Sequence, residues 1–132
     1  MTIKEIYDTY KTIAVYGMST NASKPSNYVP VFLQSKGYKI IPVNPVADTI
    51  AGEKAYKFLK DIPDEIDILN VFRPSAACLE VVEEAIERKK LRGDIKLIWL
   101  QLGIANEQAK ALAESNGIEF VQNMCMKDEF NG

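Results

Sequence analysis

Polar and basic side chains next to glycine and proline mark four short segments where this chain could do chemistry. The first segment holds Gly17, Met18, Ser19, Lys24 and Ser26. Hydroxyl groups, backbone amides, the start of a helix and a lysine together favour an anion, and phosphate in particular. The same composition is equally typical of a polar surface turn with helix-capping serines. The segment predicts an anion site and leaves the structural alternative open.

The second segment, Val43, Asn44 and Pro45, ends an apolar run that also contains Pro42. The two prolines stiffen an extended backbone whose amide and carbonyl groups can face the edge of a planar base. A rigid strand exit without a ligand is the simpler interpretation of this segment taken alone.

A nicotinamide dinucleotide site would need more than these two segments offer. Its fingerprint places glycines where Ser19 and Ala22 stand, and an acidic residue at the end of the second strand. No carboxylate follows Val43 before Asp48. The pattern disfavours NAD and favours a different phosphorylated ligand.

The third and fourth segments add an aromatic ring, a guanidinium and a side-chain amide. Phe72, Arg73 and Pro74 come before an expected helix, and Gln101 stands near Gly103. The planar fork of arginine suits phosphate because it donates two hydrogen bonds at once. The structural alternatives are a core position for Phe72 and a surface ion pair for Arg73.

The chain contains no histidine. This excludes Ser-His-Asp and Cys-His nucleophile pairs and any histidine-ligated zinc or haem. Catalysis would need a perturbed carboxylate, lysine, tyrosine or thiol, or a bound cofactor. The two cysteines, Cys78 and Cys125, indicate neither a disulfide framework nor a metal cluster. We therefore expect no metal and no catalytic residue.

Hydrophobic periodicity indicates the elements that position these segments. Near-continuous apolar runs, typical of parallel strands buried on both faces, predict five strands at residues 12–17, 38–43, 66–71, 95–100 and 118–122. Helices are expected to open at Thr2, Pro25, Pro74 and Asn106. The link at residues 44–64 is expected to be mostly irregular, with Leu59 and Ile62 buried. In the third helix, Glu84 and Arg88 have the spacing of a surface ion pair.

Strands alternating with helices predict an α/β fold. We expect residues 1–132 to form a single doubly wound, Rossmann-like domain whose five-stranded parallel sheet has the order 3-2-1-4-5. Ligands of such folds bind at the carboxyl ends of the strands where the winding reverses, which in this order lies between strands 1 and 4. Ser19, Lys24, Arg73 and Gln101 all follow strands at this edge. Their coincidence favours a phosphorylated, nucleotide-like ligand.

Charge and hydropathy indicate which partners and which cellular location to expect. A formal net charge of −2 over 132 residues disfavours non-specific binding to nucleic acid. No apolar run approaches membrane-spanning length, and the first residues lack the apolar region of a signal peptide. We expect a cytoplasmic protein that binds neither membranes nor nucleic acid.

Several of these motifs, in this order, resemble one known family. The chain resembles the small stand-alone coenzyme A-binding proteins. The motifs that carry the resemblance are Gly17-Met18-Ser19, Lys24-Pro25-Ser26, the run from Gly37 to Pro45, Asp67 through Arg73, Trp99 to Gly103, and Cys125. Those proteins are similar to the N-terminal CoA-binding domain of the succinyl-CoA synthetase alpha subunit. The resemblance runs from about residue 10 to Cys125. It implies a Rossmann-like fold that binds CoA or an acyl-CoA.

The resemblance also implies a role for each segment. The first would hold the CoA phosphates, with Gly17, Met18 and Ser19 approaching them, Lys24 neutralising one, and Ser26 at the helix start. The second would flank the adenosine end with Val43, Asn44 and Pro45. Phe72, Arg73 and Pro74 would line the cleft opposite, and Gln101 would lie toward the pantetheine.

These observations predict non-catalytic binding of CoA or an acyl-CoA at the carboxyl ends of the strands. Two alternatives stay open: an NAD(P)-dependent oxidoreductase, and a CoA-binding accessory subunit of an acyl-CoA ligase. A protein partner or a homo-oligomer also stays open. A mixed disulfide between Cys125 and the CoA thiol is a further hypothesis, but no histidine is present to lower the pKa of this cysteine.

Overall fold

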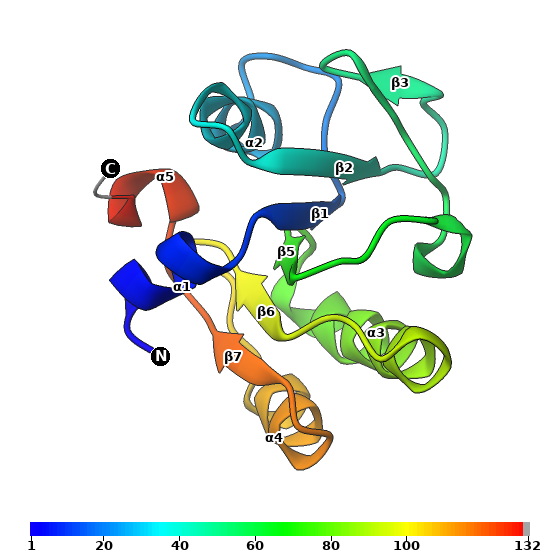
Figure 1. Ribbon diagram of the computed structural model, residues 1–132, viewed down its shortest axis with the longest axis vertical. Helices are drawn as coiled ribbons and strands as arrows, with labels where there is room; N and C mark the ends of the chain where they lie inside the picture. The colour runs from blue at the N-terminus through cyan, green and yellow to red at the C-terminus, as the bar shows by residue number, and fades with distance from the viewer. Residues whose placement is uncertain (131–132) are drawn as a thin grey trace.

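A five-stranded parallel sheet forms the centre of the fold. The computed structural model describes residues 1–130, and Figure 1 shows the sheet between two groups of helices. Its strands are β1 Thr12–Tyr16, β2 Lys39–Val43, β5 Ile68–Val71, β6 Leu97–Leu100 and β7 Glu119–Val121. They lie in the order β2-β1-β5-β6-β7, and every neighbouring pair is parallel. The predicted α/β, doubly wound class is confirmed.

The expected strand order, 3-2-1-4-5, requires a correction. The third predicted strand is β5, which lies between β1 and β6, so that the order in the same numbering is 2-1-3-4-5. The outer edge of β2 is instead taken by Tyr56, whose amide donates to the Pro42 carbonyl at 3.0 Å and whose carbonyl accepts from the Asn44 amide at 2.9 Å. A third strand therefore cannot pair there. The winding reverses between β1 and β5, and the turns after these two strands meet.

The link at residues 44–64 is more regular than expected. It contains an antiparallel hairpin of β3 Thr49–Ile50 and β4 Glu53–Lys54, followed by a short 3-10 helix, η1 Leu59–Asp61. Leu59 and Ile62 are fully buried, as predicted. The hairpin lies beside β2, and Tyr56, which follows it, pairs with the edge of β2 that would otherwise present unpaired backbone groups to solvent.

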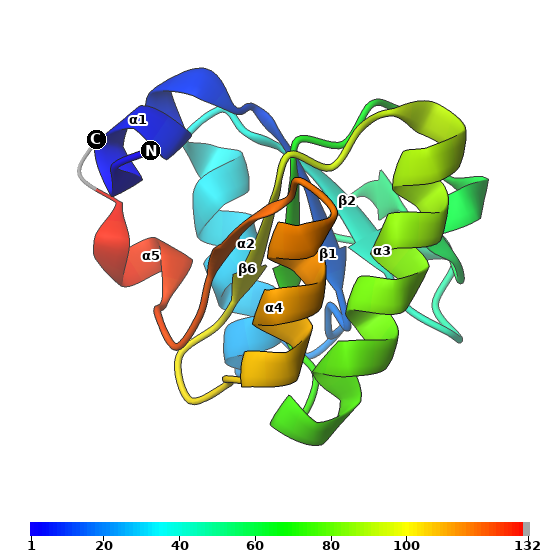
Figure 2. The same cartoon turned by 90° about the horizontal axis from the view of Figure 1, so that it is seen from below.

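Helices cover both faces of the sheet (Figures 1 and 2). On one face lie α1 Ile3–Thr9, α2 Pro25–Ser35 and α5 Met126–Glu129, and on the other lie α3 Cys78–Arg92 and α4 Glu107–Ser115. A 3-10 turn, η2 Ser75–Ala77, precedes α3. Each face buries its own apolar cluster, so the strands are buried on both sides as their near-continuous apolar runs predict.

Local capping signals correctly predict where several helices begin. The Thr2 hydroxyl accepts from the Glu5 amide at 3.2 Å, while the Glu5 carboxylate accepts from the Thr2 amide at 2.9 Å. This is the reciprocal capping box. Asn106 caps α4 by accepting from the Ala109 amide at 2.9 Å. Pro25 occupies the first turn of α2, where the missing amide costs little.

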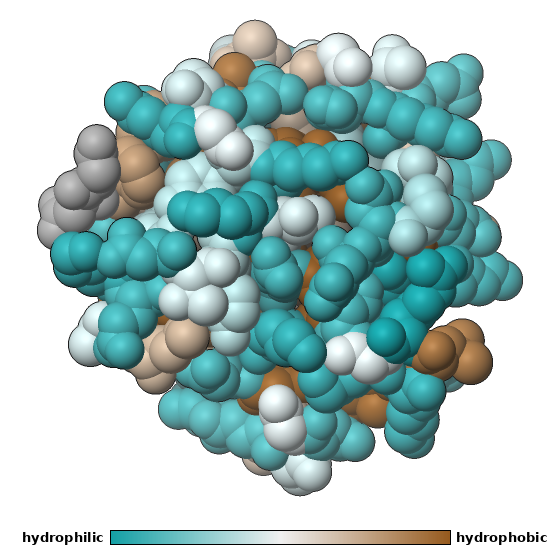
Figure 3. Space-filling model, in the orientation of Figure 1, coloured by the Kyte–Doolittle hydropathy of each residue, from teal (hydrophilic) through white to brown (hydrophobic). Residues whose placement is uncertain are grey.

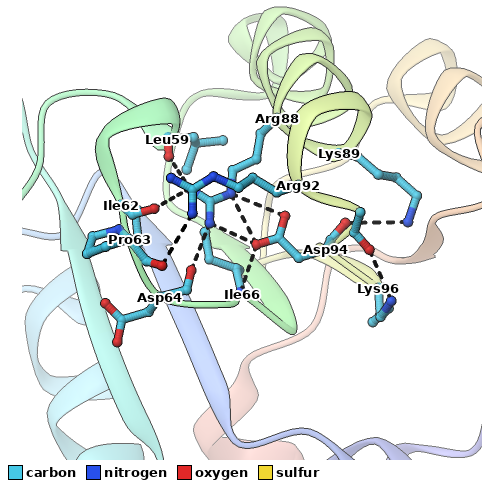
Figure 4. A network of polar contacts seen from close by, with 11 residues as sticks. Leu59, Ile62, Pro63, Asp64, Ile66, Arg88, Lys89, Arg92, Asp94 and Lys96 are labelled. Atoms are coloured by element: carbon cyan, nitrogen blue, oxygen red, sulfur yellow. Dashed lines mark hydrogen bonds and ion pairs between the residues drawn. The ribbon is translucent and has the colours of Figure 1, made fainter.

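A buried ion pair fixes the link to the far end of α3 (Figure 4). Arg88, only 2% exposed, donates to both carboxylate oxygens of Asp94. Its remaining donors reach the backbone carbonyls of Leu59, Ile62 and Asp64. Through these hydrogen bonds the buried guanidinium joins η1, α3 and the segment between α3 and β6.

The predicted surface pair of Glu84 with Arg88 is wrong. The Glu84 carboxylate instead accepts from the Leu59 amide at 2.9 Å and from the Tyr16 hydroxyl. Burial, followed by this hydrogen bond, raises the pKa of Tyr16 well above its usual range. Tyr16 therefore stays protonated and ties the end of β1 to α3.

No helix among residues 1–130 combines the length and apolarity needed to cross a lipid bilayer. The face of the molecule in Figure 3 is covered mainly by hydrophilic residues, and its apolar residues form small, separate patches.

Candidate functional site

A cleft of about 660 Å³ opens at the carboxyl edge of the sheet, between the start of α2 and α5. It is lined by Lys24, Pro25, Ser26, Tyr28, Val29, Phe72, Arg73, Pro74, Gln101, Leu102, Ile104, Cys125, Lys127 and Asp128. Its size and largely apolar lining with a few polar groups are typical of small-molecule sites. The ends of β5 and β6 supply the floor, as expected for a doubly wound fold.

Gly17 explains why the turn after β1 lies so close to the end of β5. Its φ is +88°, a conformation that other residues rarely adopt. A Cβ at this position would lie 2.7 Å from the Phe72 carbonyl oxygen and 3.2 Å from Cδ of Arg73. Only glycine permits this approach, which brings the β1 turn beneath the side chain of Arg73.

The turn after Gly17 is held in shape by its own polar groups. The Ser19 amide donates to the Ser26 carbonyl at 3.2 Å, and the Ser19 hydroxyl accepts from the Asn21 amide at 3.0 Å. The Asn27 side chain donates to the Ser19 carbonyl at 2.8 Å. Met18 is 1% exposed and packs in the core. The turn is therefore preorganised.

The start of α2 faces the cleft with a positive end. Lys24 occupies the cap position and makes no capping hydrogen bond with its side chain, and Pro25 follows it. Lys24, Pro25 and Ser26 all line the cleft. The helix dipole, the Ser26 hydroxyl and the Lys24 ammonium thus act on the same space.

The Val43–Pro45 segment lies at the same edge but does not line the cleft. The Val43 carbonyl accepts from the Gly17 amide at 2.9 Å. The Asn44 side chain donates to the Met18 carbonyl at 2.9 Å and accepts from the amides at positions 46 and 47. The polar groups of Asn44 are thus used to join the turns after β1 and β2, while Pro45 is exposed.

Gln101 is buried, with 3% exposure, although it lines the cleft. Its amide donates to the Asn70 side-chain oxygen at 2.7 Å, and its oxygen accepts from the Met126 amide at 3.4 Å. Among residues 1–130, the Asn70 side-chain nitrogen has no hydrogen-bond partner. Gln101 therefore joins the sheet to the start of α5.

Helix α5 forms a wall of the cleft that the sequence did not predict. The Tyr7 hydroxyl donates to the Met126 carbonyl, and the Trp99 indole donates to the Met124 carbonyl at 2.8 Å. Burial raises the pKa of Tyr7 above its usual range, which keeps this donor protonated. Within α5, the Lys127 ammonium lies 5.6 Å from the centre of the Tyr28 ring, close enough for a cation–π contact.

The structure thus brings together half of the predicted site residues in the cleft. Those lining it are Lys24, Ser26, Phe72, Arg73, Pro74 and Gln101. Gly17, Met18, Ser19, Val43, Asn44 and Pro45 form the adjoining part of the edge. Sequence reasoning missed Tyr28, Ile104, Lys127 and Asp128, which come from the body of α2 and from segments without a recognisable motif.

The charges around the cleft favour an anionic ligand. Lys24, Arg73 and Lys127 line it, together with the single acidic side chain of Asp128. Residues 1–130 contain no group of three or more side chains suited to hold a metal ion. The arrangement can bind a phosphorylated molecule whose remaining surface is apolar.

A family model described as a CoA binding domain matches residues 11–131 of this chain. The chain belongs to the CoA-binding domain family. A relative of nearly the same length is the uncharacterized protein YneT of Bacillus subtilis, 40% identical over 95% of this chain and 89% of its own. Among solved structures, the Thermus thermophilus protein known as cell-free ID.343 has a TM-score of 0.88 and 34% identity. It covers 98% of this chain and 96% of its own.

Larger enzymes contain a similar domain. The ADP-forming acetate–CoA ligase II of Archaeoglobus fulgidus is 36% identical over 66% of this chain, which spans only 14% of that ligase. The dinucleotide-forming acetyl-coenzyme A synthetase 1 of Ca. Korarchaeum cryptofilum has a TM-score of 0.73 and 26% identity. It covers 86% of this chain, which spans 26% of the synthetase. The CoA-binding domain is therefore a small part of these enzymes.

Proposed function

We propose that this protein binds coenzyme A or an acyl-CoA without transforming it, along the carboxyl edge of β1, β5 and β6. The observation that carries the proposal is a largely apolar cleft lined by Lys24, Arg73 and Lys127, beside the Gly17 turn, in a chain of the CoA-binding domain family. A CoA molecule combines several phosphate charges with a long, weakly polar pantetheine arm. The donor set of the cleft fits both parts.

In this proposal the phosphates lie between the Gly17 turn and the start of α2. The turn of Gly17, Met18 and Ser19 approaches them, although the Gly17 and Ser19 amides already donate to the Val43 and Ser26 carbonyls. The hydroxyl of Ser26 contacts the phosphates, and Lys24 neutralises one of them. The absence of a Cβ at position 17 lets the β5 turn pack against this turn, which places the side chain of Arg73 beside the proposed phosphate position.

The remaining predicted residues hold the two ends of the ligand. Val43, Asn44 and Pro45 flank the adenosine, and Pro45 is the exposed residue of the three. Phe72, Arg73 and Pro74 line the cleft opposite α2. Gln101 lies toward the pantetheine and acts by keeping α5 in place, because both of its polar atoms are already bonded.

The residues of the cleft support binding rather than chemistry. A general base must lie within hydrogen-bond reach of the proton that it removes and needs a pKa near neutrality. The chain has no histidine, and the cleft is lined by one acidic residue, Asp128, beside Lys127. The pKa of Tyr16 is raised further from neutrality.

A thermal-shift comparison tests this proposal against a nicotinamide-dependent oxidoreductase. A ligand that binds only the folded state stabilises it by RT ln(1 + [L]/Kd), about 2.7 kcal/mol at a concentration of 100 Kd. We expect CoA and acetyl-CoA to raise the Tm, and NADH and NADPH at the same concentration to leave it unchanged. A larger shift with NADH than with CoA would contradict the proposal.

A second candidate, an accessory subunit that supplies the CoA site to a ligase made of other chains, is favoured by one comparison. The alpha subunit of the acetate–CoA ligase II of Pyrococcus furiosus is 32% identical over 74% of this chain, which spans 21% of that subunit. Native gel filtration of a cell extract tests this candidate, with the chain followed by immunoblot. Elution with a larger complex that has acyl-CoA ligase activity supports it, and elution of the chain apart from any ligase activity contradicts it.

A further inference from the structure

Apolar side chains also line the cleft, and the phosphate-binding residues do not explain them. They include Tyr28, Phe72, Leu102, Ile104 and Cys125, and the two that follow β6, Leu102 and Ile104, form what we call the apolar end. Leu102 is 65% exposed and Tyr28 is 42% exposed. Single exposed apolar side chains are ordinary, but their grouping around one cleft indicates a binding surface.

Two hydrogen-bonded turns hold this apolar end in place. The Asn123 amide donates to the Ile104 carbonyl at 3.0 Å, and the Asn123 side-chain oxygen accepts from the Gly103 amide at 2.7 Å. Asn123 has a φ of +58°, in the left-handed region that asparagine tolerates better than most residues. Leu102 is therefore presented to solvent by a rigid support and not by a loose loop.

A third apolar side chain belongs to the same support. Met124 follows Asn123, is 39% exposed, and its amide lies 3.5 Å from the Leu100 carbonyl. The turn after β7 thus lies against the end of β6, although Met124 itself does not line the cleft. We call Tyr28, Leu102 and Ile104, which do line it, the apolar lip.

We infer that the apolar lip binds an aliphatic acyl chain, so that the preferred ligand is a medium-chain acyl-CoA. This inference rests on the proposed function. With the phosphates at Lys24 and Arg73 and the pantetheine along Gln101, the thioester emerges where Leu102 and Ile104 line the cleft. An acyl chain attached there leaves water and contacts the lip.

The apolar lip disfavours acyl groups that carry a carboxylate. Lys127 lies over the rings of Tyr28 and Phe32, at 5.6 and 5.3 Å from their centres, and its neighbour Asp128 also lines the cleft, so that the two charges balance. A terminal carboxylate would lose hydration against the lip without gaining a net positive charge. The site therefore selects hexanoyl-CoA over succinyl-CoA.

Calorimetric titration of the whole chain with CoA, acetyl-CoA, hexanoyl-CoA and succinyl-CoA tests the inference. Full burial of one methylene strengthens binding about fourfold, and half burial about twofold. Four additional carbons, half buried, predict that hexanoyl-CoA binds ~16-fold more tightly than acetyl-CoA. Succinyl-CoA is expected to bind no more tightly than acetyl-CoA.

A matched pair of variants locates the effect. Leu102→Asn should reduce the preference for hexanoyl-CoA over acetyl-CoA at least threefold and leave the affinity for CoA unchanged. Leu91→Asn is the control, because Leu91 is 80% exposed on α3, on the other face of the sheet, and it should keep the full preference. A thermal melt of each variant checks that both remain folded.

The outcomes separate the inference from the proposed function. If CoA binds and hexanoyl-CoA binds no more tightly than acetyl-CoA, the acyl inference is wrong and the CoA site stands. An unchanged preference in Leu102→Asn also overturns the assignment of the lip. If neither CoA nor any thioester binds, the proposed function itself fails.

Discussion

Replacement of Gly17 by alanine tests whether the turn after β1 depends on close contact with the end of β5. Two costs combine at this position. A non-glycine residue at φ +88° costs about 1–2 kcal/mol. The added methyl would lie 2.7 Å from the Phe72 carbonyl oxygen, so the backbone must move apart, at a cost of about 1–3 kcal/mol. The sum is about 2–5 kcal/mol.

Gly37→Ala provides a matched control for the first of these costs. Gly37 has a nearly equal φ of +95°, but no atom lies within 4 Å of its added Cβ. This variant should therefore lose only about 1–2 kcal/mol of folding free energy. The difference between the two variants isolates the contact between the β1 turn and the β5 turn.

Urea unfolding and thermal melts of the two variants give the comparison. At roughly 4 °C per kcal/mol for a chain of this size, Gly17→Ala should lower the Tm by about 8–20 °C and Gly37→Ala by about 4–8 °C. Gly17→Ala should also weaken CoA binding, because the added methyl displaces Arg73, which lines the cleft, whereas Gly37→Ala should not. If both variants lose the same stability and keep the same affinity, the structural role assigned to Gly17 is refuted.

Two further predictions concern charge. Arg73→Ala should weaken CoA binding by about 1–3 kcal/mol, as measured by calorimetry. The stability should change little because Arg73 is exposed, and replacement of another exposed arginine, Arg92→Ala, should leave CoA binding unchanged. Equal affinities for Arg73→Ala and the unaltered protein would remove Arg73 from the site. Burial raises the pKa of Asp94, but hydrogen bonds from Arg88 and from the Ile66 amide outweigh it, so the pKa lies below the ordinary value of an aspartate. The stability that the ion pair contributes is present above about pH 4 and is lost as the pH falls through the lowered pKa of Asp94. Asp94→Asn should therefore be less stable at neutral pH and should lose less of its stability below about pH 4, as measured by acid unfolding. The same loss of stability below about pH 4 in the variant and the unaltered protein would contradict this contribution of the pair.

The strands and the helix starts follow from local sequence patterns, and this is why they could be predicted. The runs at residues 12–17 and 66–71 are apolar on both faces in the sequence, and both lie buried inside the sheet. The capping residues Thr2 and Asn106 act within one helical turn of themselves. Interactions of this range are visible in the sequence alone.

The strand order could not be predicted because it depends on contacts between distant backbones. Tyr56 occupies the edge of β2 through hydrogen bonds with Pro42 and Asn44, and no residue type announces such a pairing. Arg88 gives a similar case. The spacing of Arg88 from Glu84 is that of a surface ion pair. The turn at Gly93 brings Asp94 back to the Arg88 guanidinium, which is buried against this carboxylate.

Some residues of the candidate site could likewise be predicted from the sequence, and others could not. Lys24, Arg73 and Gln101 could be predicted because each follows a strand end, where the topology of parallel sheets collects side chains. Lys127 and Asp128 lie on a helix of four residues, too short for a periodic signal. Their place in the cleft is set by Tyr7, Trp99 and other residues that anchor α5 from far away in the sequence.

The central claim, that CoA binds at the carboxyl edge of the sheet, is tested most directly by nuclear magnetic resonance. The ¹⁵N-labelled protein is titrated with CoA, and the amide signals are followed. The account predicts saturable shifts concentrated at Gly17, Ser19, Ser26 and Arg73, with small changes at the amino edge near Lys11. Absence of shifts at millimolar CoA, or shifts centred on the amino edge, would contradict it.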